Sequence, residues 1–179
     1  MTTGAATRAL LLAIARDAVG AAVRGTGRGT FADAPLFREE RGVFVTLTQG
    51  GRLRGCIGRI DPDGPLSSLL PDVAVLSATA DPRFPVVSPT ELESLHIEIS
   101  LLSVPVLVTG PAEIHIGRHG LMVSGRGRRG LLLPQVATEY GWTAEEFLSQ
   151  TCLKAALPAD AWTRDGVRIH TFETEIIGD

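Results

Sequence analysis

Lysine is almost absent from this chain: the 17 basic residues are 16 arginines and Lys154. Against 20 acidic residues they leave a formal net charge of −3, so no overall charge attracts the protein to nucleic acid or to an anionic membrane. Long apolar runs are also lacking, because Arg16 and Asp17 interrupt the run that begins at Leu10. We therefore expect a cytoplasmic protein with no signal peptide, no membrane span and no membrane partner.

Cysteine and aromatic residues are few as well. Two cysteines in 179 residues do not form a disulfide framework, which indicates a reducing compartment. Neither H-E-x-x-H nor a paired C-x-x-C pattern is present, so we expect no metal and no cofactor. Aromatic residues make up 5% of the chain, which leaves few side chains on which nucleic-acid bases could stack.

The predicted elements occur twice in the order strands, helix, strand. The first half has a helix over residues 7–23, strands over 43–48 and 53–60, a helix over 67–80 and a strand over 96–102. In the second half, strands over 113–116 and 121–124 form a predicted hairpin, and a third strand covers 131–133. Helices follow over 135–140 and 143–155, the second opened by a capping-box pattern at residues 143–146, and a strand covers 167–177. This repetition predicts an α+β fold, either as two similar lobes or as one curved sheet.

One of the two cysteines lies in an arginine-rich strand, RLRGCIG at residues 52–58. Because side chains alternate along a strand, Cys56 is expected on the same face as Arg54, with Leu53 and Ile57 on the other face. A nearby guanidinium group favours the thiolate, which is the nucleophilic form of cysteine. The pattern is therefore compatible with a reactive thiol.

The same segment also has a purely structural interpretation. Free cysteine is among the most buried residue types, so Cys56 is compatible with a small core residue at a tight bend. Gly55 and Gly58 indicate the close approach of another backbone or of a ligand. Cys152, in contrast, lies in a predicted helix beside Phe147 and is expected in the core.

Polar residues elsewhere are weaker candidates. Asp81 and Arg83 lie in a proline-bounded loop, where they either pair with each other or present an acid and a base to a ligand. Glu98 lies on the polar face of an alternating strand, which either lines a cleft or faces water. Residues 125–130 match G-x-G-x-x-G, but a strand follows them instead of a helix, so we expect no dinucleotide there. Their arginines are compatible with an RNA-binding rim or with a solvated hairpin tip.

Five sequence motifs occur in a characteristic order: LRGCIG at 53–58, DPRFP at 81–85, IEISLLS at 97–103, GLLLPQVA at 130–137 and KAALP at 154–158. Together with Trp142, Phe147 and Trp162, they resemble the AMMECR domain, known in prokaryotes as AmmeMemoRadiSam system protein A. The resemblance covers residues 8–177. The family usually has glycine after the Lys-Ala pair, where this chain has Ala156.

This resemblance implies a single domain over residues 1–179, with two sub-lobes that divide near residues 105–112. The implied fold is α+β: two β-α-β repeats form a barrel-like, largely antiparallel sheet, with helices packed outside and a cleft between the lobes. The resemblance also implies association with a Memo-type protein and a radical S-adenosylmethionine protein. It implies no particular reaction.

Our leading hypothesis is a cysteine-dependent enzyme, or enzyme component, that acts on a small anionic or carbonyl-bearing substrate. Cys56 is the candidate nucleophile or redox thiol, and Arg54 is the candidate stabiliser of the thiolate and of a bound anion. The weaker candidates for substrate binding are Asp81, Arg83, Glu98, Gln135 and Lys154. The alternatives are a non-catalytic protein that docks the two partners and, third, an RNA-binding protein.

Four further predictions concern the placement of these residues. Cys56 should border a cleft between the lobes, with residues 81–85 in the cleft wall. A cation, either Arg54 or another such as Arg83, should lie close to the thiol. The Lys154 ammonium should contact helix-terminal carbonyls or an acidic partner, because a cation is favoured at the C-terminus of a helix. The arginines at positions 126, 128 and 129 should be exposed.

Overall fold

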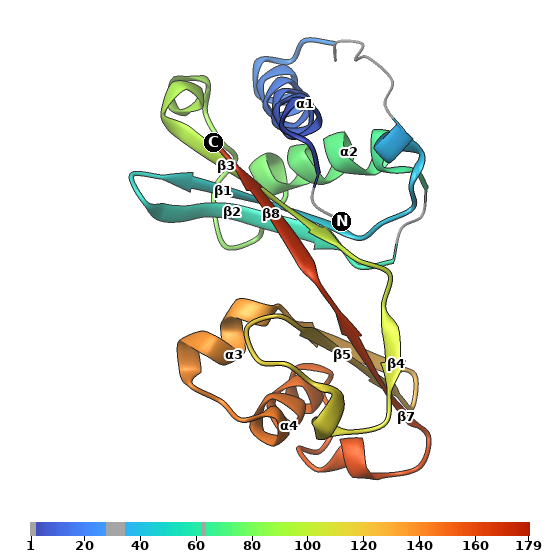
Figure 1. Ribbon diagram of the computed structural model, residues 1–179. Helices are drawn as coiled ribbons and strands as arrows, with labels where there is room; N and C mark the ends of the chain where they lie inside the picture. The colour runs from blue at the N-terminus through green and yellow to red at the C-terminus, as the bar shows by residue number, and fades with distance from the viewer. Residues whose placement is uncertain (1–2, 28–34, 62–63) are drawn as a thin grey trace. The chain divides into compact units, whose positions relative to one another are not determined.

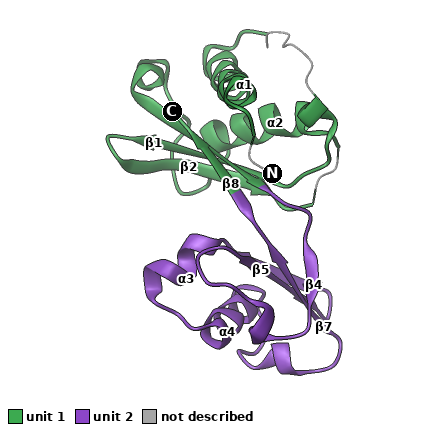
Figure 2. Cartoon of the chain, viewed as in Figure 1, with its two compact units in different colours: residues 1–101, 175–179 green, residues 102–174 purple. Residues whose placement is uncertain are grey.

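The computed structural model describes residues 3–27, 35–61 and 64–179, and the chain forms two compact units. Unit 1 takes residues 1–101 and 175–179, and unit 2 takes residues 102–174 (Figure 2). The chain thus leaves unit 1 a few residues before the range 105–112 and returns to it for its last strand. Each unit is described by itself.

Unit 1 is built on a four-stranded sheet with two helices on one side (Figure 1). The strand order is β2-β1-β3-β8, with β1 over Val43–Gln49, β2 over Arg52–Arg59, β3 over Leu95–Leu102 and β8 over Thr174–Gly178. The helices are α1, Ala5–Arg24, and α2, Leu66–Thr79. Alternate residues are buried in β1 and over residues 95–99 of β3, as the sequence pattern predicts, whereas from residue 99 to 102 every residue of β3 is buried, Ser100 included. The apolar residues of this face pack with those of both helices in one core.

Unit 2 contains a second four-stranded sheet, in the order β4-β7-β5-β6. Its strands are β4, Val106–Val108, β5, Gly120–Gly125, β6, Arg128–Leu132, and β7, Val167–Phe172. The helices are α3, Pro134–Tyr140, and α4, Ala144–Lys154. Helix α4 begins with the predicted capping box: the Thr143 hydroxyl accepts the Glu146 N–H, and the Glu146 carboxylate accepts the Thr143 N–H. It packs against β5 and β6.

Among the described residues, short 3₁₀ helices connect these elements: η1, Pro35–Arg38, η2, Pro89–Ser94, η3, Pro111–Glu113, and η4, Ala161–Thr163. The α+β class is confirmed, but the barrel-like sheet is not, because the described strands form two separate sheets and neither closes on itself. No helix within the described parts of the chain is long and apolar enough to cross a membrane.

Two strand predictions in the second half of the chain are wrong. The expected strand over 167–177 is interrupted at Glu173, so that β7 joins the second sheet and β8 joins the first. There Glu173 exchanges two hydrogen bonds with Ser103, at the point where the chain passes out of β3. The expected hairpin of 113–116 with 121–124 does not form either. Instead β5 pairs with β6 across Arg126 and Gly127, whose φ angles of 53° and 72° suit a tight hairpin turn.

Candidate functional site

Cys56 lies in β2, in a row of polar residues that crosses three strands. It is in register with Thr46 of β1, and Thr46 is in register with Glu98 of β3. The Thr46 hydroxyl donates to the Cys56 sulfur at 3.3 Å. Cys56 is half-buried, whereas Cys152 is fully buried, as predicted. Burial raises the pKa of the Cys152 thiol, so of the two cysteines Cys56 is the candidate for chemistry.

A β-bulge at Arg54 determines which way Cys56 points. Thr48 is in register with Leu53, but the next residue of β1, Leu47, is in register with Gly55, so Arg54 is the extra residue. Leu53 therefore shares the face of Thr48 and, with it, the face of Cys56. The expected simple alternation, with Leu53 opposite to the cysteine, is wrong.

The Arg54 side chain is hydrogen-bonded to the segment that follows α2. Its Nε donates to the Glu91 carboxylate at 2.7 Å, and its Nη1 donates to the Pro85 carbonyl at 2.8 Å. A third bond joins Nη2 to the Val86 carbonyl at 3.3 Å. Together with hydrogen bonds from Ser88, Arg54 lowers the pKa of Glu91 to about 2, so this ion pair persists in mild acid. Arg54 thus anchors the loop, and its role as stabiliser of the thiolate stays a prediction.

Asp81 and Arg83 bind the backbone of Cys56 at the open edge of β2. The Asp81 carboxylate accepts the Cys56 N–H at 2.8 Å, and the Arg83 Nη2 donates to the Cys56 carbonyl at 3.3 Å. The same Arg83 nitrogen lies 2.7 Å from Asp81, in a second ion pair. Because β2 is an edge strand, its outward N–H and C=O groups would otherwise have no partner in the sheet. The loop supplies both partners at Cys56.

The electrostatics of this cluster fix a cation at the backbone of Cys56. The side-chain hydrogen bond from Arg83 holds the pKa of the buried Asp81 carboxyl far below its usual range, so Asp81 is ionised. In turn, that hydrogen bond raises the pKa of Arg83. The Arg83 side chain is 55% exposed, although its carboxylate partner is buried. Its remaining donors can therefore meet a ligand from solvent.

The two glycines that flank Cys56 are required by close contacts. A Cβ on Gly55 would lie 2.1 Å from the Ser77 carbonyl oxygen of α2, and a Cβ on Gly58 would lie 2.1 Å from the Phe44 ring. The prediction that another backbone approaches closely is confirmed at Gly55, whereas at Gly58 the close neighbour is a side-chain ring. In β2 they let the strand rest directly on the helix and on the aromatic ring.

Of the other predicted site residues, Glu98 lies outside this cluster, and a role of Gln135 or Lys154 at the site stays a prediction. Glu98 is half-buried, two strands from Cys56 in the same row. Gln135 is the second residue of α3 and Lys154 ends α4, both in unit 2, so unit 1 holds neither. Lys154 is exposed, and its ammonium makes no hydrogen bond or ion pair with the described residues. The prediction that it contacts helix-terminal carbonyls or an acid is wrong, because its long side chain extends into solvent.

The arginines of the 125–130 hairpin are exposed, as predicted. Arg128 donates to the Ala156 carbonyl and Arg129 lies against the Met122 sulfur, so neither contact is with an acid. Within the described parts of the chain, no three or more His, Cys, Asp or Glu residues are grouped so as to hold a metal ion. That Cys56 borders a cleft between lobes stays a prediction.

Comparisons with known proteins agree with the sequence motifs. A family model described as AMMECR1 matches residues 12–177. A protein of Methanothermobacter thermautotrophicus is 46% identical over 174 residues, which cover 93% of this chain and 91% of that protein. Protein MJ0810 of Methanocaldococcus jannaschii is 48% identical over 149 residues, or 79% of this chain and 74% of that one. The crystal structure of the uncharacterized protein PH0010 from Pyrococcus horikoshii is similar with a TM-score of 0.82 and 39% identity, over 93% of this chain and 88% of that one.

Proposed function

The chain belongs to the AMMECR1 family, and on this premise we propose that it is a cysteine-dependent enzyme or enzyme component with Cys56 as its nucleophile. One observation carries the proposal. The Arg83 guanidinium is fixed to the Cys56 backbone by a buried, ionised carboxylate, and it keeps donors free toward solvent. In this proposal Arg83 stabilises the thiolate and a bound anion, which is the role that the sequence suggested for Arg54.

The reaction class follows from the chemistry of a thiolate beside a cation. The Cys56 thiol loses its proton to water, and the thiolate sulfur then attacks an electrophilic carbonyl carbon. As the new S–C bond forms, the carbonyl electron pair moves onto the oxygen, where hydrogen-bond donors of Arg83 stabilise the negative charge. The same donors would hold a carboxylate or phosphate group of the substrate. A small anionic or carbonyl-bearing substrate fits this site.

Alkylation by iodoacetamide, followed by mass spectrometry of the labelled peptides, tests the proposal. We expect the folded protein to be labelled at Cys56 and not at the buried Cys152. Arg83→Gln should slow labelling of Cys56 at neutral pH about tenfold, whereas Arg83→Lys, which keeps the charge, should slow it less. A Cys56 that reacts only after unfolding, or that reacts equally fast in Arg83→Gln, would contradict the proposal.

A non-catalytic role in docking the Memo-type and radical S-adenosylmethionine proteins is the second candidate, and an exposed apolar segment favours it. In and beside the edge strand β4, Val104, Val106 and Leu107 are 73%, 62% and 60% exposed. Large exposed aliphatic side chains on a sheet edge are typical of a protein contact. This role is supported if the two partner proteins co-purify with the wild type and do not co-purify with Leu107→Glu. Co-purification unaffected by the substitution would count against it.

A further inference from the structure

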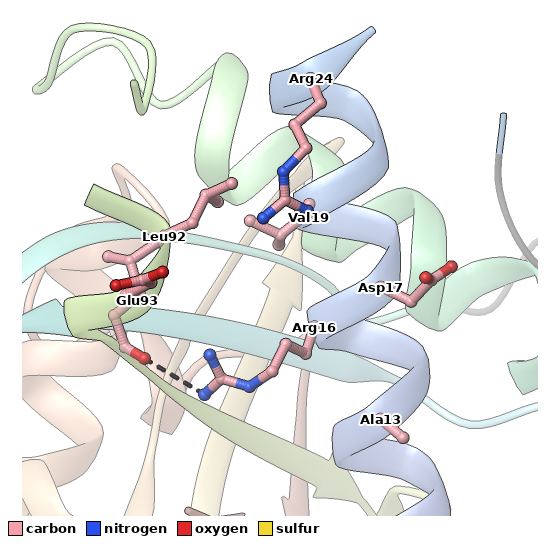
Figure 3. A pocket seen from close by; sticks show the side chains of 9 residues that line it. Ala13, Arg16, Asp17, Val19, Arg24, Leu92 and Glu93 are labelled. Atoms are coloured by element: carbon pink, nitrogen blue, oxygen red, sulfur yellow. Dashed lines mark hydrogen bonds between the residues drawn. The ribbon is translucent and has the colours of Figure 1, made fainter. Parts of the chain in front are cut away.

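A pocket of about 620 Å³ opens in unit 1 between α1 and η2, and it contains none of the residues around Cys56 (Figure 3). A volume in this range holds a small molecule. The lining residues are Ala13, Arg16, Asp17, Val19, Gly20, Arg24, Leu92, Glu93 and Leu95. Of these, Val19, Leu92 and Leu95 are buried and provide an apolar wall.

The helix side of the pocket is shaped by a glycine between two arginines. Arg16, Gly20 and Arg24 follow one another at four-residue intervals, so they lie along one face of α1. The Arg24 side chain folds back along the helix, and its Nη1 lies 3.0 Å from the place where a Cβ of Gly20 would be. Glycine in a helix interior is unfavourable relative to alanine. Here it leaves room for a guanidinium group at the rim of the pocket.

The charges that line the pocket are not all neutralised by the protein. Arg16 donates to the Leu95 carbonyl at 3.1 Å and pairs with the Asp179 carboxylate. The side chains of Arg24 and Glu93, in contrast, make no hydrogen bond or ion pair within residues 3–27, 35–61 and 64–179. Figure 3 shows Arg24 on the helix side and Glu93 on the η2 side of the same space, whereas Asp17 points away. One cation and one anion are thus left to meet a ligand.

We propose that this pocket binds a small zwitterion of the α-amino-acid class that carries an apolar side chain. The ligand carboxylate would pair with Arg24, its ammonium group with Glu93, and its side chain would cover Val19 and Leu92. A simple anion would meet the repulsion of Glu93, and a simple cation that of Arg24, so charge complementarity favours a ligand with both charges. Because Arg24 and Glu93 are exposed, affinity rests on weak contacts, and we expect a dissociation constant on the order of 1 mM.

Titration of the full-length protein with L-leucine, followed by amide chemical shifts in NMR spectra, tests this site. We expect saturable shifts in α1 and η2, and a dissociation constant raised about tenfold in Arg24→Gln and in Glu93→Gln. Two analogues with the same apolar group separate the charges: 4-methylpentanoate lacks the amine and 3-methylbutylamine lacks the carboxylate. Each should bind about tenfold more weakly than leucine.

Two control variants make the outcome specific. Asp17→Asn changes a lining carboxylate that points away from the space, so it should alter the affinity for leucine by less than about twofold. Cys56→Ser should leave leucine binding unchanged, so that a failure of the cysteine proposal does not affect this one. No saturable shift with leucine, equal binding of 4-methylpentanoate, or unchanged binding in both glutamine variants would overturn the proposal.

Discussion

The carboxylate of Asp81 holds the backbone of Cys56, with its Oδ2 only 2.8 Å from the cysteine nitrogen. The same oxygen accepts a hydrogen bond from Arg83 at 2.7 Å. A single buried group therefore determines both where the thiol-bearing strand lies and where the neighbouring cation lies. Loss of this carboxylate should affect the stability of unit 1 and the reactivity of Cys56 together.

Asp81→Asn should destabilise unit 1 by about 2 kcal/mol, because hydrogen bonds to a charged acceptor become bonds to a neutral one. The amide also keeps only one acceptor oxygen for the donors of Cys56 and Arg83. Urea unfolding followed by circular dichroism measures the change. Thr79→Ser, a mild change at the end of α2, is the control and should have less than half the effect. Equal stability of Asp81→Asn and the wild type would show that the carboxylate's charge does not matter.

The ion pair between Arg54 and Glu91 predicts a dependence of stability on acid pH. The pKa of Glu91 in the folded chain is about 2, below its unfolded value, so its ionised form stabilises the fold above about pH 4.3. That contribution is lost as the pH falls from about 4.3 toward 2. In this range the Glu91 carboxylate of the unfolded chain is protonated first, and that of the folded chain is protonated only near pH 2. Glu91→Gln should therefore be less stable than the wild type at neutral pH, and the difference should shrink in acid.

Thermal unfolding at a series of pH values measures this difference. The exposed Glu40 provides the control, because Glu40→Gln should give a small difference from the wild type at every pH. The pKa of Asp81 is also lowered, so protonation of Asp81 in acid reduces the stability of the wild type as well. Only the comparison between variants therefore isolates the contribution of Glu91. A difference between Glu91→Gln and the wild type that is constant with pH would contradict the assignment.

The direction of Cys56 could not be derived from strand alternation alone. The two-residue turn at Gly50 and Gly51 sets a register that, continued without interruption, would place Cys56 opposite the buried Val45. The bulge at Arg54 shifts this register by one residue and puts Cys56 opposite Thr46 instead. No residue type in the segment indicates a bulge at that position. Thr46 was therefore missed as the hydrogen-bond donor to the sulfur.

The partners of Arg54 could not be derived from the sequence for a related reason. Proximity along the chain favoured Arg54, yet its partner Glu91 is 37 residues away and its other partners are carbonyl groups of the loop. Local patterns did predict the helices and the capping box of α4, because both depend on residues close together in the sequence. The glycines of β2 indicated close contacts but not the partners, Ser77 and Phe44, which are distant in the sequence. Ion-pair choice depends on how loops fold back, which a single sequence does not specify.

Gly55→Ala should be among the most damaging small substitutions in unit 1. The added methyl group would meet the backbone oxygen of Ser77 at 2.1 Å, and neither β2 nor α2 can move without disturbing the core. We expect a loss of about 3 kcal/mol in the free energy of unfolding. Gly58→Ala meets the Phe44 ring, a side chain that can rotate, so its effect should be smaller. Gly110→Ala, which has open space around it, should be nearly neutral; a similar loss in all three would refute a specific contact.

Ala156 adopts a backbone conformation that favours glycine, and its replacement should stabilise the protein. Helix α4 ends at Lys154, and Ala156 follows with a φ of 55°. The Ala156 N–H bonds to the Leu153 carbonyl and the Leu157 N–H to the Cys152 carbonyl, which is the pattern of a Schellman motif. Glycine is the usual residue there, and it is also the residue that the AMMECR pattern usually has.

Ala156→Gly should therefore raise the stability of unit 2 by about 1 kcal/mol, because relief of the left-handed strain exceeds the added entropy of the unfolded chain. This corresponds to an increase of about 3 °C in the melting temperature, which fluorescence of Trp142 and Trp162 can follow within this unit. The adjacent Ala155→Gly is the matched control. Ala155 is buried with a φ of −80°, so glycine there gains nothing and should cost about 1 kcal/mol. If both glycine variants shift the melting temperature in the same direction, backbone strain at Ala156 is not what limits the stability of unit 2.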